Sequence, residues 1–130
     1  MNAPCFYRVS VKGIVIDEQG RILLACESNG TWDMLGGGLD HGEDPIACLK
    51  REIQEETGLT VTKIWPEPKH FITAHKVSNN ICVANVVYQI ELENLDFTPS
   101  NECEELRFFS AEELRNLQLP PNMQQLTREL

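Results

Sequence analysis

Residues 37–59 read GGLDHGEDPIACLKREIQEETGL, and this stretch predicts a glycine-rich loop that leads into an acidic helix. Glu52, Glu55 and Glu56 stand at i, i+3 and i+4, a spacing that makes side chains neighbours on a helix surface. Clustered carboxylates repel one another unless a cation neutralises them, and carboxylate-bound divalent cations commonly serve phosphate chemistry. A solvated acidic helix is the alternative, but it would place Lys or Arg four residues after each acid, where Glu52 instead meets Glu56.

The ends of this helix are marked by the sequence. Asp44 suits the position that caps a helix start, and Pro45 suits the first turn, where its missing N–H would be unpaired anyway. Gly58 suits the helix end. Apolar residues repeat at intervals of three and four between these ends, which predicts a buried stripe beside the acidic face.

The composition of the whole chain is that of one small globular domain. Its 130 residues are 42% hydrophobic, enough to bury a core. Acidic residues outnumber basic ones by 20 to 11, and the net charge of −9 argues against binding to polymeric nucleic acid. Five scattered cysteines, no signal peptide and no apolar run of ~20 residues predict a cytoplasmic protein with reduced thiols and no membrane span.

The rest of the chain alternates strand-like segments with turns, which predicts a mixed α/β domain. Segments 6–16 and 21–25 flank a polar turn, and we expect them to pair as a hairpin. Ser110 and Glu113 form a capping box for a second helix, and a last short helix is expected to open at Asn122. Further strands are expected at 60–64, 69–77, 81–92 and 105–109.

Residues 37–59 resemble the signature of the Nudix hydrolase family, which includes MutT-like proteins, at every defining position. The match consists of a glycine, a glutamate six residues later and an Arg-Glu-aliphatic-x-Glu-Glu-x-Gly-aliphatic run. Nine defined positions at fixed spacing make this match specific, whereas the flanking strands resemble the family more loosely. The resemblance implies a Nudix-type α/β/α sandwich with a mixed sheet, formed as one domain by residues 1–130.

The resemblance also implies a Mg²⁺-dependent enzyme, with Mn²⁺ as the alternative metal. The Gly36 carbonyl would help to hold the metal, and Arg51 would orient the glutamates rather than touch the substrate. Glu55 and Glu56 are the first choices for direct ligands, because Mg²⁺ keeps several waters and needs few carboxylates. Glu52 is the candidate for the general base or a third ligand.

A second acidic cluster supplies a further candidate ligand. Glu102 and Glu105 resemble the family segment in which a glutamate near a late strand adds a metal ligand or a base. The two fit equally well, and a solvated acidic loop is the alternative for either of them. The identity of the general base therefore stays open between Glu52 and the loop at 102–105.

Substrate contacts are expected around the glycine segment. Gly37 and Gly38 allow the backbone to approach a ligand closely, and Glu43 would orient the loop or bind metal through water. Trp32 can stack on a base or pack under the loop, and Arg8 can contact a phosphate or remain a surface charge.

The departures from the family pattern bear on the substrate. Many members carry arginine after the second strand, where this chain has Ala25-Cys26-Glu27, so a common phosphate contact is absent or supplied elsewhere. The downstream proline of ADP-ribose hydrolases and the tyrosine of dinucleoside polyphosphate hydrolases are also missing. The default substrate is therefore a nucleoside triphosphate, oxidised and non-standard ones included, cleaved to monophosphate and pyrophosphate. Hydrolysis of ADP-ribose, a nucleotide sugar or a dinucleoside polyphosphate, and a non-catalytic nucleotide sensor, are the alternatives; a homodimer is the expected assembly if the chain is not monomeric.

Overall fold

The computed structural model describes residues 4–130, which form eight strands and three helices. In chain order these are β1 (Tyr7–Ile14), β2 (Ile22–Cys26), β3 (Trp32–Asp33), β4 (Leu35–Gly38), α1 (Pro45–Thr57), β5 (Val61–Ile64), β6 (His70–Lys76), β7 (Ile81–Leu92), β8 (Glu105–Phe109), α2 (Ala111–Arg115) and α3 (Pro121–Arg128).

The larger sheet is mixed and is built on β7, a twelve-residue strand rich in β-branched side chains. β1 pairs with β7 in parallel and with β4 in antiparallel orientation. β6 pairs with the first half of β7, and β5 pairs with its last residues. β7 is the central strand of this sheet. It pairs with β1, which in turn pairs with β4, and these last two strands line the site described below.

The predicted hairpin between residues 6–16 and 21–25 is present only as a short antiparallel contact. β1 ends at Ile14; beyond it, an isolated bridge joins Ile16 to Ile22 and the Leu23 N–H donates to the Val15 carbonyl at 3.0 Å. β2 instead enters a second sheet with strand order β3-β2-β8. The physical reason is burial. Residues 22–25 are all buried, so the backbone N–H and C=O groups of β2 need partners within the protein, and β8 supplies them along the whole strand.

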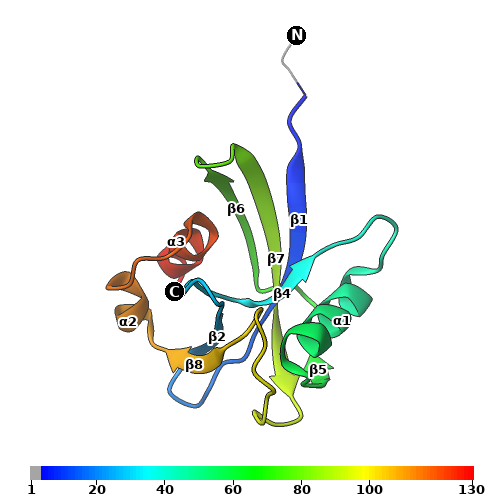
Figure 1. Ribbon diagram of the computed structural model, residues 1–130, viewed down its shortest axis with the longest axis vertical. Helices are drawn as coiled ribbons and strands as arrows, with labels where there is room; N and C mark the ends of the chain where they lie inside the picture. The colour runs from blue at the N-terminus through cyan, green and yellow to red at the C-terminus, as the bar shows by residue number, and fades with distance from the viewer. Residues whose placement is uncertain (1–3) are drawn as a thin grey trace.

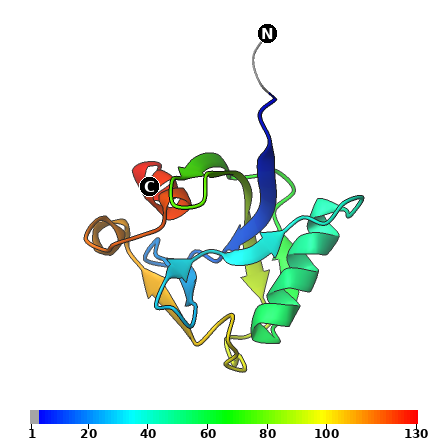
Figure 2. The same cartoon turned by 45° about the horizontal axis from the view of Figure 1, so that its top comes forward.

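The layers follow the predicted α/β/α sandwich. Figure 1 shows α1 on one side of the sheets and α2 and α3 on the other, and the turned view of Figure 2 keeps this separation. Two apolar clusters fill the layers. One joins Leu49 and Ile53 of α1 to Val11 of β1, and the other joins Met123 and Leu126 of α3 to the opposite part of the core.

The structure confirms the predicted ends of α1. The side chain of Asp44 accepts a hydrogen bond from the Ala47 backbone N–H at 3.0 Å, and Pro45 begins the helix. Gly58 ends it in the left-handed conformation, with φ of 75°. The glycines before the helix differ from the prediction, because Leu35–Gly38 is strand β4 rather than a loop.

Candidate functional site

A cavity of about 420 Å³ opens beside β1, β4 and α1, and four acidic residues line it. Glu52 and Glu56 come from α1, Glu102 comes from the segment before β8, and Glu27 directly follows β2. Gly36, Gly37 and Gly38 also line the cavity. Acids from three separate parts of the chain therefore meet at a wall made of glycine backbone.

Glu56 is the most buried of these acids. Its side chain accepts a hydrogen bond from the Gly36 backbone N–H at 2.8 Å, and the residue is 9% exposed. Burial raises the pKa of Glu56 to about 8; the Gly36 hydrogen bond and the charge of Lys12 oppose the shift, and Glu52 and Glu102 add to it. The carboxyl is therefore protonated at neutral pH unless a cation takes the place of the proton.

Glu52 lies directly against the backbone of β4. A Cβ atom at Gly37 would overlap the carboxylate of Glu52, so only glycine leaves room for the acid at this position. The other side of the carboxylate accepts a hydrogen bond from Arg51 Nη1 at 3.1 Å. The acid is thus held between a glycine wall and a guanidinium.

Arg51 holds the acids of the loop and helix together. Its guanidinium binds both oxygens of Glu43, at 2.7 and 2.9 Å, and it also donates to Glu52 and Glu55. The hydrogen bonds from Arg51 lower the pKa of Glu43 to about 2. The carboxylate of Glu55 is more than half exposed, lies against Arg51 and is not among the residues that line the cavity.

The two late candidates, Glu102 and Glu105, lie in different places. Ser100 Oγ donates to the Glu56 carbonyl at 3.0 Å, and this contact brings the segment that carries Glu102 against the end of α1. Glu102 lines the cavity, whereas Glu105 pairs with Arg107 at 2.7 Å on the exposed part of β8. The structure therefore brings Glu102, but not Glu105, to the carboxylate cavity.

Trp32 and Arg8 do not reach this cavity either. Trp32 packs edge-to-face on Phe109, with ring centroids 4.9 Å apart, and the guanidinium of Arg107 lies over its ring. Arg8 donates to the Leu39 carbonyl at 2.6 Å and lies beside Gly38. Trp32 thus packs within the protein, and the guanidinium of Arg8 binds a backbone carbonyl outside the cavity.

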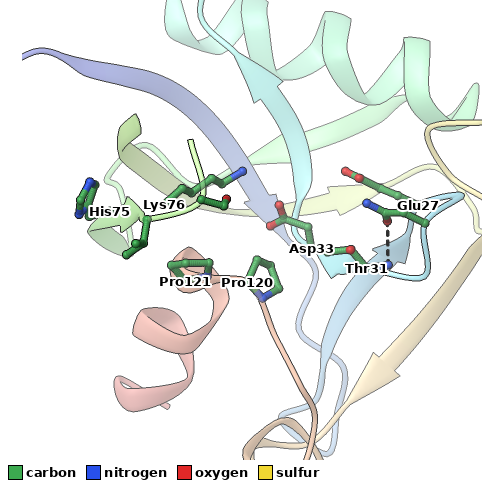
Figure 3. A pocket seen from close by; sticks show the side chains of 10 residues that line it. Glu27, Thr31, Asp33, His75, Lys76, Pro120 and Pro121 are labelled. Atoms are coloured by element: carbon green, nitrogen blue, oxygen red, sulfur yellow. Dashed lines mark hydrogen bonds between the residues drawn. The ribbon is translucent and has the colours of Figure 1, made fainter. Parts of the chain in front are cut away.

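A second cavity, of about 480 Å³, adjoins the first, because Glu27 and Asn29 line both. Figure 3 shows Asp33 among its lining side chains, with Pro120 and Pro121 at the start of α3 close by. Sequence reasoning missed this cavity. Its one local signal is an acid, Asp33, in the otherwise uncharged segment 31–39. This segment leads into the signature at residues 37–59, which we call the box.

Lys12 is a second residue that sequence reasoning missed. It lies on β1, lines the carboxylate cavity and is 9% exposed. A signal for it is present, because Arg8, Ser10 and Lys12 alternate with valines and must share one face of the strand. Ser10 also lines the cavity, so this polar face of β1 forms part of the site.

The donor set fits a hard divalent cation that keeps most of its water. Within residues 4–130, no three His, Cys, Asp or Glu side chains are gathered closely enough to form a complete metal site. Mg²⁺ does not require one, because waters and substrate phosphates complete its octahedral shell. Glu52, Glu56, Glu102 and the Gly36 backbone surround the same space, and Lys12 is the one cationic side chain of the described residues that lines it with these three acids.

The helices of the described chain are short. None of them, within residues 4–130, has the length and apolar character that a membrane crossing requires.

Solved structures and curated relatives resemble this chain. The structure of a MutT protein from Methanosarcina mazei Go1 superposes with a TM-score of 0.77 over 95% of this chain and 91% of that one, at 24% identity. A MutT-like protein of Streptomyces ambofaciens is 43% identical over 61 residues, which cover 46% of this chain and 40% of the relative. An RNA pyrophosphohydrolase of Saccharophagus degradans is 42% identical over 55 residues, covering 41% of this chain and 32% of the relative.

The matched segments thus span less than half the length of these curated relatives. The family model described as the NUDIX domain, in contrast, matches residues 6–130, nearly the whole chain. On this match, together with the shared fold and the box at 37–59, the chain belongs to the Nudix family.

Proposed function

We propose that this protein is a Mg²⁺-dependent pyrophosphohydrolase that cleaves a nucleoside triphosphate, oxidised or non-standard ones included, to a monophosphate and pyrophosphate. The observation that carries the proposal is the meeting of Glu52, Glu56 and Glu102 at one glycine-walled cavity. A cavity with this concentration of acid binds a polyphosphate only through cations, which links metal and substrate binding. Mn²⁺ is the alternative metal.

The residues of the chain divide the work. Glu56, Glu102 and the Gly36 carbonyl would hold the metal, which, when bound, would neutralise the diphosphate and acidify water. Glu52 would take the proton of the attacking water, because Arg51 and Gly37 fix its carboxylate in place. The water oxygen bonds to the α- or the β-phosphorus, and the bond from that phosphorus to the bridging oxygen breaks. The bridging oxygen leaves with pyrophosphate after attack at the α-phosphorus and stays on the monophosphate after attack at the β-phosphorus.

Glu55 has a different proposed part from the one first expected. Its carboxylate reaches Arg51 at 3.2 Å and lies outside the cavity, so it can join the metal shell only after a side-chain rotation. Glu105 is paired with Arg107 and does not line the cavity, so we do not propose it as a metal ligand. We therefore rank Glu102 above Glu105 as the third acid of the site.

The nucleoside is proposed to occupy the second cavity. Its volume of about 480 Å³ suits a ligand of that size, and it adjoins the carboxylate cavity through Glu27 and Asn29. Asp33 offers this cavity a carboxylate that is already held by a hydrogen bond from Asn122 at 3.0 Å. A ligand spanning both cavities would place its phosphates against the acids and its base near Asp33.

Two other readings follow from the comparisons and from the fold. A 5′-triphosphorylated RNA end is a candidate, because some curated relatives are RNA pyrophosphohydrolases. A non-catalytic sensor would bind nucleotide without turnover, although it has no need of all the box glutamates that this chain retains. We place the reaction in the cytoplasm, where the five free cysteines would stay reduced, and expect a homodimer if the protein assembles.

The first experiment measures turnover across a substrate panel with Mg²⁺ and with Mn²⁺. The panel holds nucleoside triphosphates, 8-oxo-dGTP, ADP-ribose, nucleotide sugars, dinucleoside polyphosphates and a 5′-triphosphate RNA oligonucleotide. Released phosphate is measured after coupling to pyrophosphatase or phosphatase. Metal-dependent turnover of a nucleoside triphosphate supports the proposal, whereas thermal stabilisation by a nucleotide with no turnover anywhere favours the sensor.

Matched variants then test the assigned base. Glu52→Gln should lower kcat by about 10²–10⁴-fold, the usual contribution of a general base, while nucleotide binding persists. Glu18→Gln, in an exposed turn far from the box, removes the same charge and should leave kcat unchanged. Unchanged turnover in Glu52→Gln would transfer the role to Glu102, which Glu102→Gln then tests.

A further inference from the structure

Lys12 is a buried cation in a cavity that is otherwise acidic. The cavity is lined by four acids, Glu27, Glu52, Glu56 and Glu102, and Lys12 is its one cationic side chain among the described residues. The residue is 9% exposed, and its side chain lines the cavity beside these acids. Burying an ammonium group lowers stability unless it has good partners, so its place here calls for a physical reason.

The partners within the protein are insufficient. The nearest carboxylate is that of Asp33, whose Oδ2 lies 3.8 Å from Lys12 Nζ, which is beyond hydrogen-bond distance. Within residues 4–130, Nζ donates no hydrogen bond, although an ammonium group carries three donors. Asp33 itself is engaged elsewhere, because it accepts hydrogen bonds from Asn122 and from the Met34 backbone.

A metal ion cannot be the missing partner. A cation bound by Glu52 and Glu56 would be repelled by the ammonium group of Lys12, since like charges in one cavity raise each other's free energy. An anion, in contrast, would attract both the ammonium group of Lys12 and a metal ion bound by Glu52 and Glu56. The chain also lacks arginine after β2, where Ala25, Cys26 and Glu27 stand, so no cation from that segment is available to a phosphate.

The position of Lys12 indicates which phosphate it meets. Lys12 lines the carboxylate cavity, whereas its nearest acid, Asp33, lines the adjoining one. The ammonium group therefore lies at the junction of the two cavities. We propose that Lys12 binds a non-bridging oxygen of the substrate phosphate that is attached to the nucleoside, and thereby supplies the phosphate contact that the Ala25-Cys26-Glu27 segment lacks.

This proposal rests on the proposed function, and its test separates the two. The probes are the α,β-imido analogues of dATP, dGTP, dCTP and dTTP with Mg²⁺, and the dissociation constant of the tightest analogue is measured by calorimetry. Lys12→Met should weaken binding about ten- to hundredfold, the usual effect of a hydrogen bond to a charged group. Lys12→Arg should recover part of the loss. Lys50→Met removes the same charge from an exposed position on α1 and should change the constant less than twofold.

A second measurement excludes a merely structural role. Mg²⁺ alone should bind Lys12→Met as tightly as the wild type or more tightly, because a repelling cation is gone. Among the products, the nucleoside monophosphate should lose affinity for this variant more than pyrophosphate does. Weaker binding of both Mg²⁺ and nucleotide, together with a lower melting temperature, would overturn the proposal in favour of a structural role.

The remaining outcomes assign failure to one proposal or the other. Tight analogue binding by the wild type and an equal constant for Lys12→Met would overturn the role of Lys12 and leave the proposed function standing. A wild-type protein that binds none of the four analogues and turns over no nucleoside triphosphate of the panel, 8-oxo-dGTP included, would overturn both. Lys12→Gln, a shorter and polar replacement, serves as the second variant if the methionine variant is poorly folded.

Discussion

Glu56 combines two properties that rarely coexist in a stable protein. It is a carboxylic acid buried against a backbone N–H, and it lies within a cavity that holds other acids. Its pKa of about 8 lies well above the ordinary value of 4.5 because burial disfavours the charged form. The proton on this residue is therefore part of the stability of the metal-free fold.

The metal-free protein should lose stability as the pH rises from 5 to 9. The folded-state pKa of Glu56 exceeds the unfolded one, so the fold binds the proton more tightly. The resulting stability is full below about pH 4.5 and disappears as the pH rises through about 8. Urea unfolding in EDTA measures this loss, which we expect to be at most about 4 kcal/mol for this group, since each pKa unit corresponds to about 1.4 kcal/mol. Glu56→Gln should remove this component, and an identical pH profile in the variant would contradict the assignment.

Added Mg²⁺ should reverse that dependence. The metal competes with the proton for Glu56, so its apparent affinity should rise with pH until about pH 8 and then level off. The rise in melting temperature caused by saturating Mg²⁺ should accordingly be larger at pH 8.5 than at pH 6. In Glu56→Gln the increment should be small and independent of pH. A larger increment at pH 6 in the wild type would argue against Glu56 as a ligand.

Arg51 and Glu43 should behave as one unit in mutagenesis. The pair is bidentate, so Arg51→Lys, which keeps the charge but loses the planar fork, should still lower kcat about tenfold or more. Glu43→Gln should have a similar effect, and the double variant should be little worse than either single one. The pKa of Glu43, about 2, predicts that the pair survives in acid down to about pH 3. Fully additive losses in kcat would contradict this coupling.

The sequence predicted the acids of the box far better than their surroundings. The spacing of Glu52 and Glu56 depends on helix geometry alone, and both reach the cavity as expected. Glu55 shares that spacing yet turns toward Arg51, because side-chain rotation is decided by neighbours that the spacing does not contain. Lys12 and Asp33 were missed because their role depends on which strands pair, and pairing is a long-range property.

Among the elements, α1 matters most, because it carries both the acids and their anchor. Its first turn is capped by Asp44 and its last by Gly58, and its apolar stripe packs into the core. α2 is capped in a comparable way by Ser110 and Glu113, which form a reciprocal capping box as predicted, but it carries no cavity residue. Substitutions at the caps of α1 and α2 can therefore be compared, because both should affect stability but only the cap of α1 belongs to a helix that carries cavity residues.

Removing either cap should cost similar stability, whereas only one should affect the site. Asp44→Ala and Ser110→Ala should each lower the free energy of unfolding by about 1 kcal/mol, measured by urea titration. Asp44→Ala should in addition weaken Mg²⁺ binding, because the loop at 39–44 and the start of α1 position Arg51 and Glu43. Equal Mg²⁺ affinities in the two variants would show that the cap does not affect the acids.

Element boundaries were predicted closely where local chemistry decides them. Caps, prolines and the left-handed glycine fixed α1 to within a residue, because these signals act over one turn. Strand partners were predicted less well, and the expected hairpin between 6–16 and 21–25 is reduced to a short antiparallel contact at Ile16 and Ile22. A short polar turn suits a hairpin and a change of sheet equally well, and only the need to cover both faces of β2 decides between them.

At the scale of the whole molecule, charge sets the range of partners. The net charge of −9 opposes contact with a phosphate backbone, and Lys12 is the one cationic side chain of the described residues that lines the carboxylate cavity. A small polyphosphate brings its own cations into the cavity, whereas a long polymer must approach the acidic surface along many phosphates. This asymmetry favours small nucleotides over nucleic acid.

The protein should accordingly bind no unstructured RNA through its backbone. A 20-nucleotide RNA with a 5′-hydroxyl end should show no binding at 10 µM protein and 50 mM salt, conditions that enhance backbone contacts. Fluorescence anisotropy measures it, with a lysine-rich peptide as positive control. Binding that weakens steeply with salt would reveal a basic surface on the assembled protein and strengthen the case for an RNA substrate.

The contact between Ser100 and the end of α1 also matters for protein engineering. Thr98 donates its N–H to the Thr57 carbonyl, and Glu93 donates its N–H to Thr60, so the intervening turn is fastened on both sides. Leu95 at its tip is about half exposed. A peptide tag or a fluorescent label placed in this turn would be mechanically isolated from Glu102, and the protein could be followed in a cell without disturbing the candidate site.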